Sequence, residues 1–460
     1  MKTIQPRTLK GFRDFLPDDM VIRQHVIAVI RSTFERYGYA PLETPTLEYA
    51  DILLGKYGEE AESLMYRFTD RGDRDVAMKY DLTVPTCRVL AQYQNEITLP
   101  FKRYQIQPVW RAENTQKGRF REFYQCDADA FGSTSQIIEA EFIQMGIEAL
   151  TELGFDQLKV RINNRKIIDG IIQYAEAREL FADICTAIDK LDKIGLQGVQ
   201  DELEKKGVNK ESIGRLTEVI TLPPDRALAT LRQILVNVEI AQDGIAEIER
   251  LFRYLEVNLN EISQNNHNLF SVCQFDPTII RGLSYYTGPV WEFTIEGGGV
   301  GSVGGGGRYD NLVNLYSGKD MPAAGGSLGI ERIIEVYKER RMLSLSANSD
   351  ILITVPSEDD ITSALQIAKR LRDKHRTTQK DGEHVNESAS LRVEVYAQPG
   401  VKLEKQLRYA NKKKIPYVVI MPKQDQHTDR SSTSSESTKA GTQYIVKNMK
   451  TGEQEVHDLI

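Results

Sequence analysis

The stretch between Pro100 and Gly132 restricts the possible folds more than any other part of the chain. Its sequence, FKRYQIQPVWRAENTQKGRFREFYQCDADAFG, places aromatic and β-branched residues on both sides of a centre rich in Lys, Gly and Arg. This pattern predicts a strand, a polar basic loop and a second strand, which together make a long hairpin. Helical spacing from Ile137 to Leu153 and an alternating pattern from Leu158 to Asn163 follow it. We therefore expect a domain of mixed α and β structure.

An amphipathic helix is predicted before the hairpin. Ile22, Val26, Ile30 and Phe34 recur every four residues after the acidic start at Asp18 and Asp19, and the pattern stops near Gly38. The prolines of the next segment, YAPLETPTLEYADIL, favour extended backbone.

The remaining chain changes character several times. Residues 175–266 are rich in Leu, Ile, Glu, Lys and Ala, which predicts a helical insertion. Strand-like residues return from Tyr286 to Ile295, before the glycine-rich run GGGVGSVGGGGRYD and a segment, AAGGSLGIERIIEV, that leads from a strand into a helix. We expect residues 1–174 and 267–342 to form one core around the insertion.

A polar linker at residues 343–349 separates a small domain, residues 350–460. The β-rich runs ILITV, LRVEVYA and PYVVIM alternate there with helical patterns, which is typical of an α/β sheet. Two polar tracts, RTTQKDGEHVNES and QDQHTDRSSTSSESTKA, lack apolar residues to bury and are interpreted as long surface loops.

Composition narrows the class of protein. The 460 residues are 40% hydrophobic and 27% charged, no apolar run approaches the roughly 20 residues of a membrane span, and no apolar stretch follows the first basic residues. We expect a cytoplasmic protein that has no contact with a membrane. The four cysteines stand far apart and the six histidines are scattered, so we assign no disulfide and no protein metal ligands. A net charge of −7 does not decide whether the chain binds nucleic acid, because binding depends on local patches of charge.

One nucleotide-binding pattern is interpreted as a chance match. Gly299, Gly301 and Gly304 fit G-x-G-x-x-G, yet they lie among eight glycines in eleven residues and open no amphipathic helix. A Walker loop is absent, so an ATP site has to be of another kind.

Arginine clusters suggest that other kind of site. The hairpin centre combines basic residues with one carboxylate: Arg111, Glu113, Lys117, Arg119 and Arg121. Two arginines come later in the chain. Arg281 stands in RGLSYYTG beside paired tyrosines, and Arg332 stands in GIERI after a glycine run. Forked guanidinium groups grip phosphate oxygens in pairs, although each motif alone is also what a solvated loop or a turn would show.

Taken in order, these motifs resemble those of class II aminoacyl-tRNA synthetases and, within them, the histidyl-tRNA synthetases. The matching stretches are KGFRDFLP, GYAPLETPTLE (motif 1), MKYDLTVP, WRAENTQKGRFREFYQCDADAFG (motif 2), RGLSYYTG and GGGGRYD (the histidine-specific motifs), GGSLGIER (motif 3) and VKLEKQLRYANKKKIPYVVI. The resemblance implies an α+β fold: an antiparallel-sheet catalytic core with a helical insertion, followed by a C-terminal α/β anticodon-binding domain. It also implies a homodimer through residues 38–54.

The resemblance further implies a reaction in which L-histidine is activated with ATP and Mg²⁺ and is transferred to tRNA(His). Arg111 and Arg281 would contact the α-phosphate as catalytic groups, and Arg332 would stack on the adenine opposite Phe123. The ATP-binding residues would be Arg111, Glu113, Arg119, Arg121, Phe123 and Arg332. The histidine-binding residues would be Asp81, Thr83, Gln125, Asp129, Arg281, Tyr285 and Tyr286, with Asp129 and Tyr286 on the imidazole.

The tRNA contacts are expected in two places. The Asn114–Arg121 loop would meet the acceptor end, and Lys412, Lys413 and Lys414 offer a basic patch that is equally well interpreted as a solvated helix end.

The chain departs from the family pattern at Ser284, where Asp is usual, and at Asp81 and Asp129, where many members have Glu. Two alternatives remain: a non-catalytic paralogue that regulates histidine biosynthesis, and a synthetase-like ligase that acts on another acceptor. The retained motifs and the C-terminal domain favour the tRNA ligase.

Overall fold

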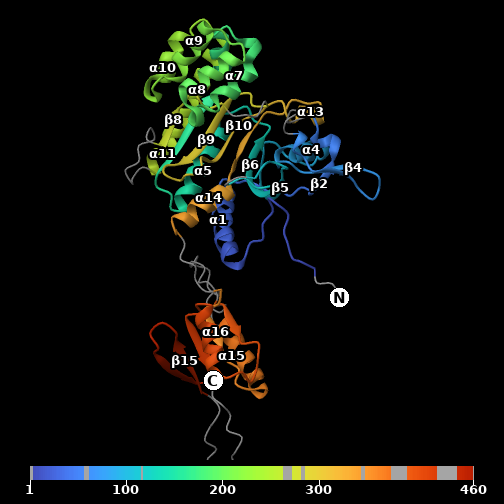
Figure 1. The fold of residues 1–460 in the computed structure, drawn as a ribbon, viewed down its shortest axis with the longest axis vertical. Coiled ribbons are helices and arrows are strands. Elements are labelled where there is room, and N and C mark those ends of the chain that lie inside the picture. Colours follow the sequence, from blue (N-terminus) through green and yellow to red (C-terminus); the bar gives the residue numbers. More distant parts are fainter. Residues whose placement is uncertain are drawn as a thin grey trace, which may run out of the picture. The chain divides into compact units, whose positions relative to one another are not determined.

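The computed structural model divides the chain into two units, Met1–Leu343 and Ser344–Ile460. The residues that it describes are 4–55, 62–115, 118–262, 272–280, 285–342, 348–373, 391–421 and 443–458. Figure 1 labels the helices and strands of both units.

An eight-stranded sheet forms the centre of the first unit. The expected hairpin is confirmed as β5 (Phe101–Trp110) and β6 (Glu122–Phe131), which pair antiparallel from Phe101 opposite Phe131 to Trp110 opposite Glu122. The strand order is β1-β5-β6-β11-β10-β9-β7-β8, antiparallel except for the two edge pairs. The other strands are β1 (Ala40–Pro41), β7 (Leu158–Asn164), β8 (Cys273–Phe275), β9 (Pro289–Ile295), β10 (Ser302–Arg308) and β11 (Ala323–Leu328).

Helices cover one face of this sheet. The apolar stripe of α1 (Pro17–Arg36), formed by Ile22, Val26, Ile30 and Phe34, is buried as the spacing predicts. Phe142 of α5 (Ile137–Glu152) packs against Trp291 and Phe293 of β9. Helix α14 (Ile330–Glu339) contacts α1, β6 and β10, and Figure 1 shows α1, α5 and α14 together against the sheet. These three helices therefore bury one face of the sheet.

The glycine-rich run forms strand β10, which the sequence analysis did not predict because four successive glycines have low strand propensity. The residues of the G-x-G-x-x-G match lead into this strand and not into a helix. Glycine is needed because β10 and β11 approach closely: a Cβ added to Gly306 would lie 2.1 Å from the carbonyl oxygen of Gly325. Close packing against β11 here outweighs the low intrinsic preference of glycine for strands.

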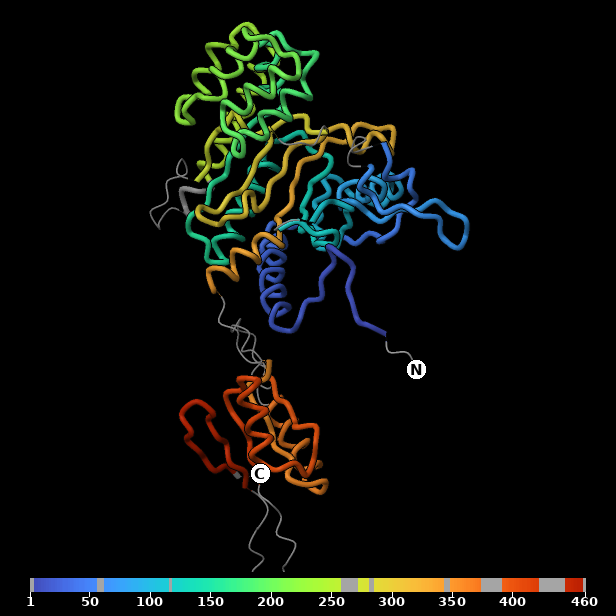
Figure 2. The backbone as a smooth tube through the Cα atoms, in the orientation of Figure 1, coloured from blue at the N-terminus to red at the C-terminus, as the bar shows by residue number. Residues whose placement is uncertain are grey.

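The segment after β7 is helical throughout its described part. Its helices are α6 (Arg165–Tyr174), the short 3₁₀ helix η1 (Arg178–Leu180), α7 (Phe181–Ile188), α8 (Leu191–Lys205), α9 (Lys210–Ile220), α10 (Pro224–Ile234) and α11 (Glu239–Ile262). Figure 2 shows α7 to α10, in green, gathered beyond one end of the sheet, whereas α11 returns to pack on α5 and α6.

A small antiparallel sheet, β2-β4-β3, lies beside the hairpin in the first unit. Its strands are β2 (Leu47–Tyr49), β3 (Arg67–Thr69) and β4 (Asp75–Met78), and the neighbouring helices are α2 (Ala50–Leu53), α4 (Thr83–Gln92) and α13 (Asn314–Ser317). In β2 the side chains of Leu47 and Tyr49 are exposed, while Glu48 between them is buried.

The second unit contains a five-stranded sheet of order β13-β12-β14-β15-β16. The three predicted strands and two predicted helices are present, and β15 and β16 extend the sheet as an antiparallel hairpin that the sequence analysis did not predict. The elements are β12 (Ile351–Ile353), the 3₁₀ helix η3 (Glu358–Asp360), α15 (Ile361–Asp373), β13 (Val393–Val395), α16 (Leu403–Lys412), β14 (Tyr417–Ile420), β15 (Gln443–Asn448) and β16 (Gln454–Asp458). All residues of the two polar tracts lie outside the described part.

All four cysteines are free thiols, and three of them are buried. Among the described residues, no helix combines the length and apolar character that crossing a membrane requires.

Replacing Gly306 with Ala should destabilise the first unit by about 3 kcal/mol or more, because the added methyl group meets backbone that cannot move aside easily. Urea titration of tryptophan fluorescence measures this unit, since both tryptophans, Trp110 and Trp291, belong to it. The control is Gly214→Ala in α9, where a Cβ meets no atom within 4 Å, and it should be neutral or slightly stabilising. Equal stability of the two variants would contradict the close approach.

Candidate active site

Strands β5 and β6 present a row of polar side chains on the sheet face opposite α5. Alternate residues of a strand point to the same side, and directly paired residues share a face. We call this surface the polar face, and its residues are Arg103, Gln105, Gln107, Gln125, Asp127 and Asp129. All except Gln125 are buried.

The neighbouring strands β11 and β10 place mainly glycines on this face. Ser327 and Gly325 of β11 lie opposite Asp127 and Asp129, and Gly305 and Gly307 of β10 follow next to them. Because glycine has no side chain, a bound molecule can approach the backbone here.

The two glutamines of the polar face on β5 are held by groups of the protein itself. The amide oxygen of Gln107 accepts hydrogen bonds from the Nζ of buried Lys79 at 3.0 Å, from Nε2 of Gln105 at 2.9 Å and from the amide of Thr44 at 3.2 Å. The oxygen of Gln105 accepts a bond from the hydroxyl of Thr86 at 2.7 Å. Burial lowers the pKa of Lys79 to about 8, against the opposing charges of Glu43 and Glu48.

The β6 half of the polar face and Arg103 of β5 are different, because several of their polar atoms have no partner. Within the described residues, ten buried side-chain nitrogen and oxygen atoms have no hydrogen-bond partner, and five of them belong to Arg103, Gln125, Asp127 and Asp129. An unpaired buried polar group costs about 1–3 kcal/mol. Among these atoms, Gln125 Oε1 and Asp127 Oδ1 are acceptors, whereas Nε and Nη1 of Arg103 are donors. A molecule that pairs with the two acceptors has to bring N–H or O–H groups.

Asp129 is anchored from two sides. Its Oδ2 lies 2.5 Å from Nη2 of Arg103, and its Oδ1 accepts a hydrogen bond from the hydroxyl of Tyr309. Burial raises the pKa of Asp129, although the Arg103 charge and the Tyr309 hydrogen bond act in the opposite direction. Burial likewise raises the pKa of Asp127 to about 7, with Arg103 opposing and Asp129 adding to the increase.

Two tyrosines border the polar face. A Cβ added to Gly307 would lie 2.7 Å from Cδ1 of Tyr286, so this ring rests directly on the glycine strand. The rings of Tyr285 and Tyr286 are 4.9 Å apart, and that of Tyr285 lies 5.6 Å from Tyr309. Tyr286 and Tyr309 belong to one buried apolar cluster, against which Tyr285 packs.

The open end of the hairpin carries the arginines. Arg111 directly follows β5, donates from Nε to the carbonyl of Tyr80 at 3.1 Å, and lies over the rings of Tyr80 and Phe123. Nη1 of Arg119 is 3.5 Å from Oε2 of Glu113. The end of the hairpin next to the polar face therefore carries guanidinium groups and aromatic rings.

Sequence comparison places this arrangement in a family. A model of the family described as histidyl-tRNA synthetase matches residues 11–333. A histidine–tRNA ligase of Cytophaga hutchinsonii is 37% identical over 475 aligned positions, which cover 98% of this chain and 97% of that protein. The chain belongs to the histidyl-tRNA synthetase family.

Solved structures agree with the histidyl-tRNA synthetase fold. A histidyl-tRNA synthetase from a Nostoc species has a TM-score of 0.79 and 27% identity, and the match covers 99% of this chain and 97% of that one. A protein from Bacillus halodurans described as an ATP phosphoribosyltransferase regulatory subunit/histidyl-tRNA synthetase has a TM-score of 0.70 at 20% identity, over 89% of this chain. At that identity the second likeness concerns the fold alone. The class II α+β architecture is therefore established.

Several of the motif residues that we expected in this family lie on the hairpin or beside it. Gln125 and Asp129 are on the polar face, and Asp81 and Thr83 lie at the start of α4, where Oδ1 of Asp81 accepts the amide of Val84 at 3.0 Å. Arg281 and Ser284 lie outside the described residues, as does Lys117.

Arg332 lies at the start of α14 and near the hairpin loop. Its Nη1 donates to the carbonyl of Ser302 at 2.6 Å, and a Cβ on Gly118 would lie 3.7 Å from its Cγ. The end of the hairpin is also tied to the N-terminal segment, because the amide of Arg121 donates to the carbonyl of Gly11.

Glu331 in motif 3 has a positioning role that sequence reasoning missed. It accepts hydrogen bonds from Arg13 at 2.6 Å, from Arg23 and from the amide of Tyr124 at 3.3 Å. Burial would raise the pKa of Glu331, but the hydrogen bonds and charges of Arg23 and Arg13 outweigh it and lower the pKa. The carboxylate therefore clamps the KGFRDFLP segment and α1 to β6, next to Arg332.

Sequence reasoning also missed Arg103, Asp127 and Tyr309. The alternation of polar residues in KRYQIQ and YQCDAD was a usable signal, since a strand with polar residues at every second position points them to one face. Tyr309 gave no such signal, because it meets Asp129 across 180 residues of chain.

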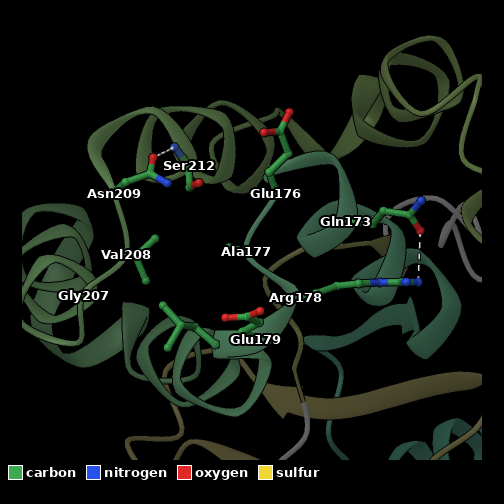
Figure 3. Close-up of a pocket in the computed structure, with 10 residues that line it drawn as sticks. Gln173, Glu176, Ala177, Arg178, Glu179, Gly207, Val208, Asn209 and Ser212 are labelled. Carbon is green, nitrogen blue, oxygen red and sulfur yellow. Dashed lines mark hydrogen bonds between the residues drawn. The ribbon is translucent and has the colours of Figure 1, made fainter.

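A separate cavity of about 320 Å³ lies in the helical segment and is lined by none of the predicted site residues. Figure 3 shows that Arg178 donates to Gln173 and that Asn209 accepts from the amide of Ser212 at the start of α9. Gln173 and Arg178 thus pair with each other and Asn209 caps α9, and we assign the cavity no function.

Replacing Arg103 with Met should destabilise the first unit by about 3–5 kcal/mol at pH 8, since Asp129 and Asp127 lose the cation beside them. Both carboxyls already have raised pKa values, and removal of Arg103 raises them further. The native protein then binds more protons than the unfolded chain, so stability falls as pH rises. The loss should be smaller at pH 5 than at pH 8, because protonation of the carboxyls removes the negative charge that Arg103 balances.

Urea titration of tryptophan fluorescence at pH 5 and pH 8 measures this difference. The control is Arg36→Met, which removes a half-exposed arginine paired with Glu152 on the surface and should change stability by no more than about 0.5 kcal/mol. A loss for Arg103→Met that is independent of pH would contradict the role of the carboxyls.

Proposed function

We propose that this protein is a histidine–tRNA ligase, which activates L-histidine with ATP, releases pyrophosphate and transfers histidine to the 3′ end of tRNA(His). The observation that carries the proposal is the set of unpartnered buried acceptors on the polar face, next to cationic groups at the end of the hairpin. Histidine supplies the missing donors through its ammonium and imidazole groups. The family membership supports the same reaction.

For histidine, we assign the imidazole to Asp129 and Tyr286, and the amino and carboxylate end to Asp81, Thr83 and Gln125. Asp129 suits an imidazole N–H because Tyr309 and Arg103 fix its orientation. Tyr286 suits the other ring nitrogen because its ring already rests on Gly307. Tyr285 lines the pocket. A polar site of this kind rejects analogues that lack the ring nitrogens, since buried groups would then stay unpaired.

For ATP, we assign the α-phosphate to Arg111 and Arg281 and the adenine to Arg332 and Phe123, with Glu113, Arg119 and Arg121 completing the site. The histidine carboxylate is itself the nucleophile, so no general base is required. Positioning of the carboxylate beside the α-phosphate and stabilisation of the developing negative charge provide the rate. The Nε bond from Arg111 to the Tyr80 carbonyl holds the guanidinium in place before ATP binds.

Mg²⁺ belongs to this proposal as the companion of the ATP phosphates, where it would neutralise phosphate charge. Among the described residues there is no group of three or more His, Cys, Asp or Glu side chains that could hold a metal ion. We therefore name no protein ligand for it.

For tRNA, we propose that the Asn114–Arg121 loop meets the acceptor end and that residues 350–460 bind the anticodon. We further propose residues 1–174 and 267–342 as the catalytic core, residues 175–266 as the insertion, and the cytoplasm, where charged tRNA is used, as the location. In the lysine triplet, Lys413 is 2.8 Å from Glu394 and closes α16, which favours the helix-end interpretation for that residue.

The catalytic proposal is tested by ATP–pyrophosphate exchange with each of the twenty amino acids, followed by charging of bulk tRNA. We expect exchange with histidine alone. Arg111→Ala should lower that exchange roughly 10²- to 10³-fold, as expected for one lost charge-stabilising group. The control is Arg226→Ala, which removes an arginine on α10 with 80% exposure and should leave the rate unchanged.

Two results would oppose these assignments. No exchange with any amino acid would favour the regulatory paralogue, and undiminished exchange by Arg111→Ala would show that Arg111 does not act on the phosphate.

We propose a homodimer through residues 38–54. Leu47 and Tyr49 of the edge strand β2 are 43% and 55% exposed, and Phe68 of β3 is 46% exposed. Tyr49 and Phe68 both pair with Val76 of β4, so they lie on one face of the small sheet. Exposed apolar and aromatic side chains gathered in this way are typical of an interface.

Replacing both Leu47 and Tyr49 with Asp should convert the dimer to a monomer in sedimentation velocity, because each copy would bury carboxylates against the other. Val236→Asp, a change at an equally exposed apolar residue between α10 and α11, is the control and should stay dimeric. A dimeric double variant would place the interface elsewhere.

A further inference from the structure

Asp127 is a carboxyl of the polar face that the proposed histidine contacts do not use. It lies between Gln125 and Asp129 on the same side of β6, and its side chain is 3% exposed. Its Oδ1 is buried without a hydrogen-bond partner. A buried, unpartnered acceptor between two residues assigned to a ligand requires an explanation.

The protein groups around Asp127 form no hydrogen bond with its Oδ1. Nε2 of Gln105, directly opposite on β5, donates to Gln107 at 2.9 Å and to Thr44 at 3.2 Å. Nη2 of Arg103 lies 2.5 Å from Asp129 Oδ2. Ser327 forms a hydrogen bond with the Asp127 carboxyl, and Oδ1 remains unpartnered. Nε and Nη1 of Arg103 are also buried without a partner, and neither of them bonds to Oδ1. No protein donor reaches Oδ1 in this structure, so a bound molecule that contacts it has to bring an N–H or O–H group.

The charges that face Asp127 favour a positively charged donor. Arg103 on β5 is the facing cation, and the facing carboxyls are Asp129 on β6 and Asp81 before α4. The phenol of partly buried Tyr285 is also close enough to interact with Asp127. Three carboxyls around one guanidinium leave an excess of negative charge when they are ionised, and a bound cation would offset it.

We propose that Asp127 contacts the substrate directly: its Oδ1 accepts a hydrogen bond from the α-ammonium group of bound histidine, next to Gln125. This inference rests on the proposed function, and it adds a carboxylate to the residues assigned to the amino end of the substrate.

The contact makes histidine binding depend on pH. Burial raises the pKa of Asp127 to about 7, so in the free protein the carboxyl is protonated below that pH and ionised above it. Only the ionised form attracts the ammonium group, so the affinity for histidine should rise as pH increases through about 7. Binding near pH 7 then releases a proton from Asp127 to the solvent.

The test is the KM for histidine in ATP–pyrophosphate exchange between pH 6 and pH 8.5, compared between the unmodified protein and Asp127→Asn. At pH 8 the variant should have a KM about tenfold higher or more, since a hydrogen bond to a charged group is lost. The difference should shrink toward pH 6, where the aspartate is protonated. Titration of the substrate's own imidazole affects both proteins equally.

The matched control is Asp360→Asn. Asp360 is also 3% exposed and also accepts a serine hydroxyl, that of Ser357 at 2.7 Å, but it belongs to the second unit. Its variant should keep the KM for histidine at every pH. Calorimetry of histidine binding at pH 7, in buffers of different ionisation enthalpy, should show a proton release that Asp127→Asn lacks.

Stability separates a substrate contact from a structural role. Asp127→Asn should unfold no earlier than the unmodified protein at pH 8, because an amide avoids burying a charge. A second variant, Ser327→Ala, removes a hydrogen bond that lowers the pKa of Asp127, so it should move the rise in affinity to higher pH.

An unchanged KM for Asp127→Asn at pH 8, or a KM increase that is the same at every pH and accompanied by lower stability, would overturn the inference. Absence of histidine exchange in the unmodified protein would instead overturn the proposed function, so the two failures are distinguishable.

Discussion

The buried ion pair between Arg103 and Asp129 is the interaction on which the site depends. A carboxylate in the interior is costly unless it is paired, and here one guanidinium on β5 serves Asp129 and also acts on Asp127. Tyr309 then binds Asp129 from the segment after β10, which connects the hairpin to the histidine-specific motifs. Without this pair, the register of β5, β6 and β11 would place carboxyls in a low-dielectric layer with no counter-charge.

The glycines of β10 and β11 are a second condition for the same site. Their backbones approach so closely that a single Cβ at Gly306 would collide with Gly325, and Tyr286 covers Gly307 on the side of the polar face. The central strands therefore form a thin floor on which a small polar molecule can lie against aromatic rings. The opposite side of the same strands is covered by α5, whose Gly146 admits the ring of Phe293.

Buried Lys79 and Glu331 connect this floor to segments far away in the sequence. Lys79 binds the Thr44 carbonyl at 3.0 Å and Gln107, so the motif 1 segment proposed for dimer contact is fixed to the strand opposite Gln125. Glu331 gathers Arg13, Arg23 and the backbone of Tyr124 beside the residues proposed for ATP. Both groups are buried charges with specific partners, an arrangement suited to holding several segments in one geometry.

Much of the architecture could be read from the sequence. Periodicity located α1, α5, the hairpin and most elements of the second unit, and the order of motifs identified the family, because these signals are local or keep fixed spacings. Strand β10 was missed because its glycines have low strand propensity, and it forms only because β9 and β11 lie on both sides of it. The β15–β16 hairpin was missed as well, since its strands are partly exposed and their polar residues leave no long apolar run.

For the candidate site residues, too, the sequence determined one part and the tertiary structure another. The residue types of the site, including Arg111, Gln125, Asp129 and Tyr286, were determined by the sequence alone, since motif spacing survives without any coordinates. Which of their atoms have hydrogen-bond partners, and which are buried without one, was decided only by the tertiary structure. Hydrogen bonding and burial depend on neighbours more than a hundred residues away, as Tyr309 and Glu331 demonstrate, and no local pattern in the chain records those distances.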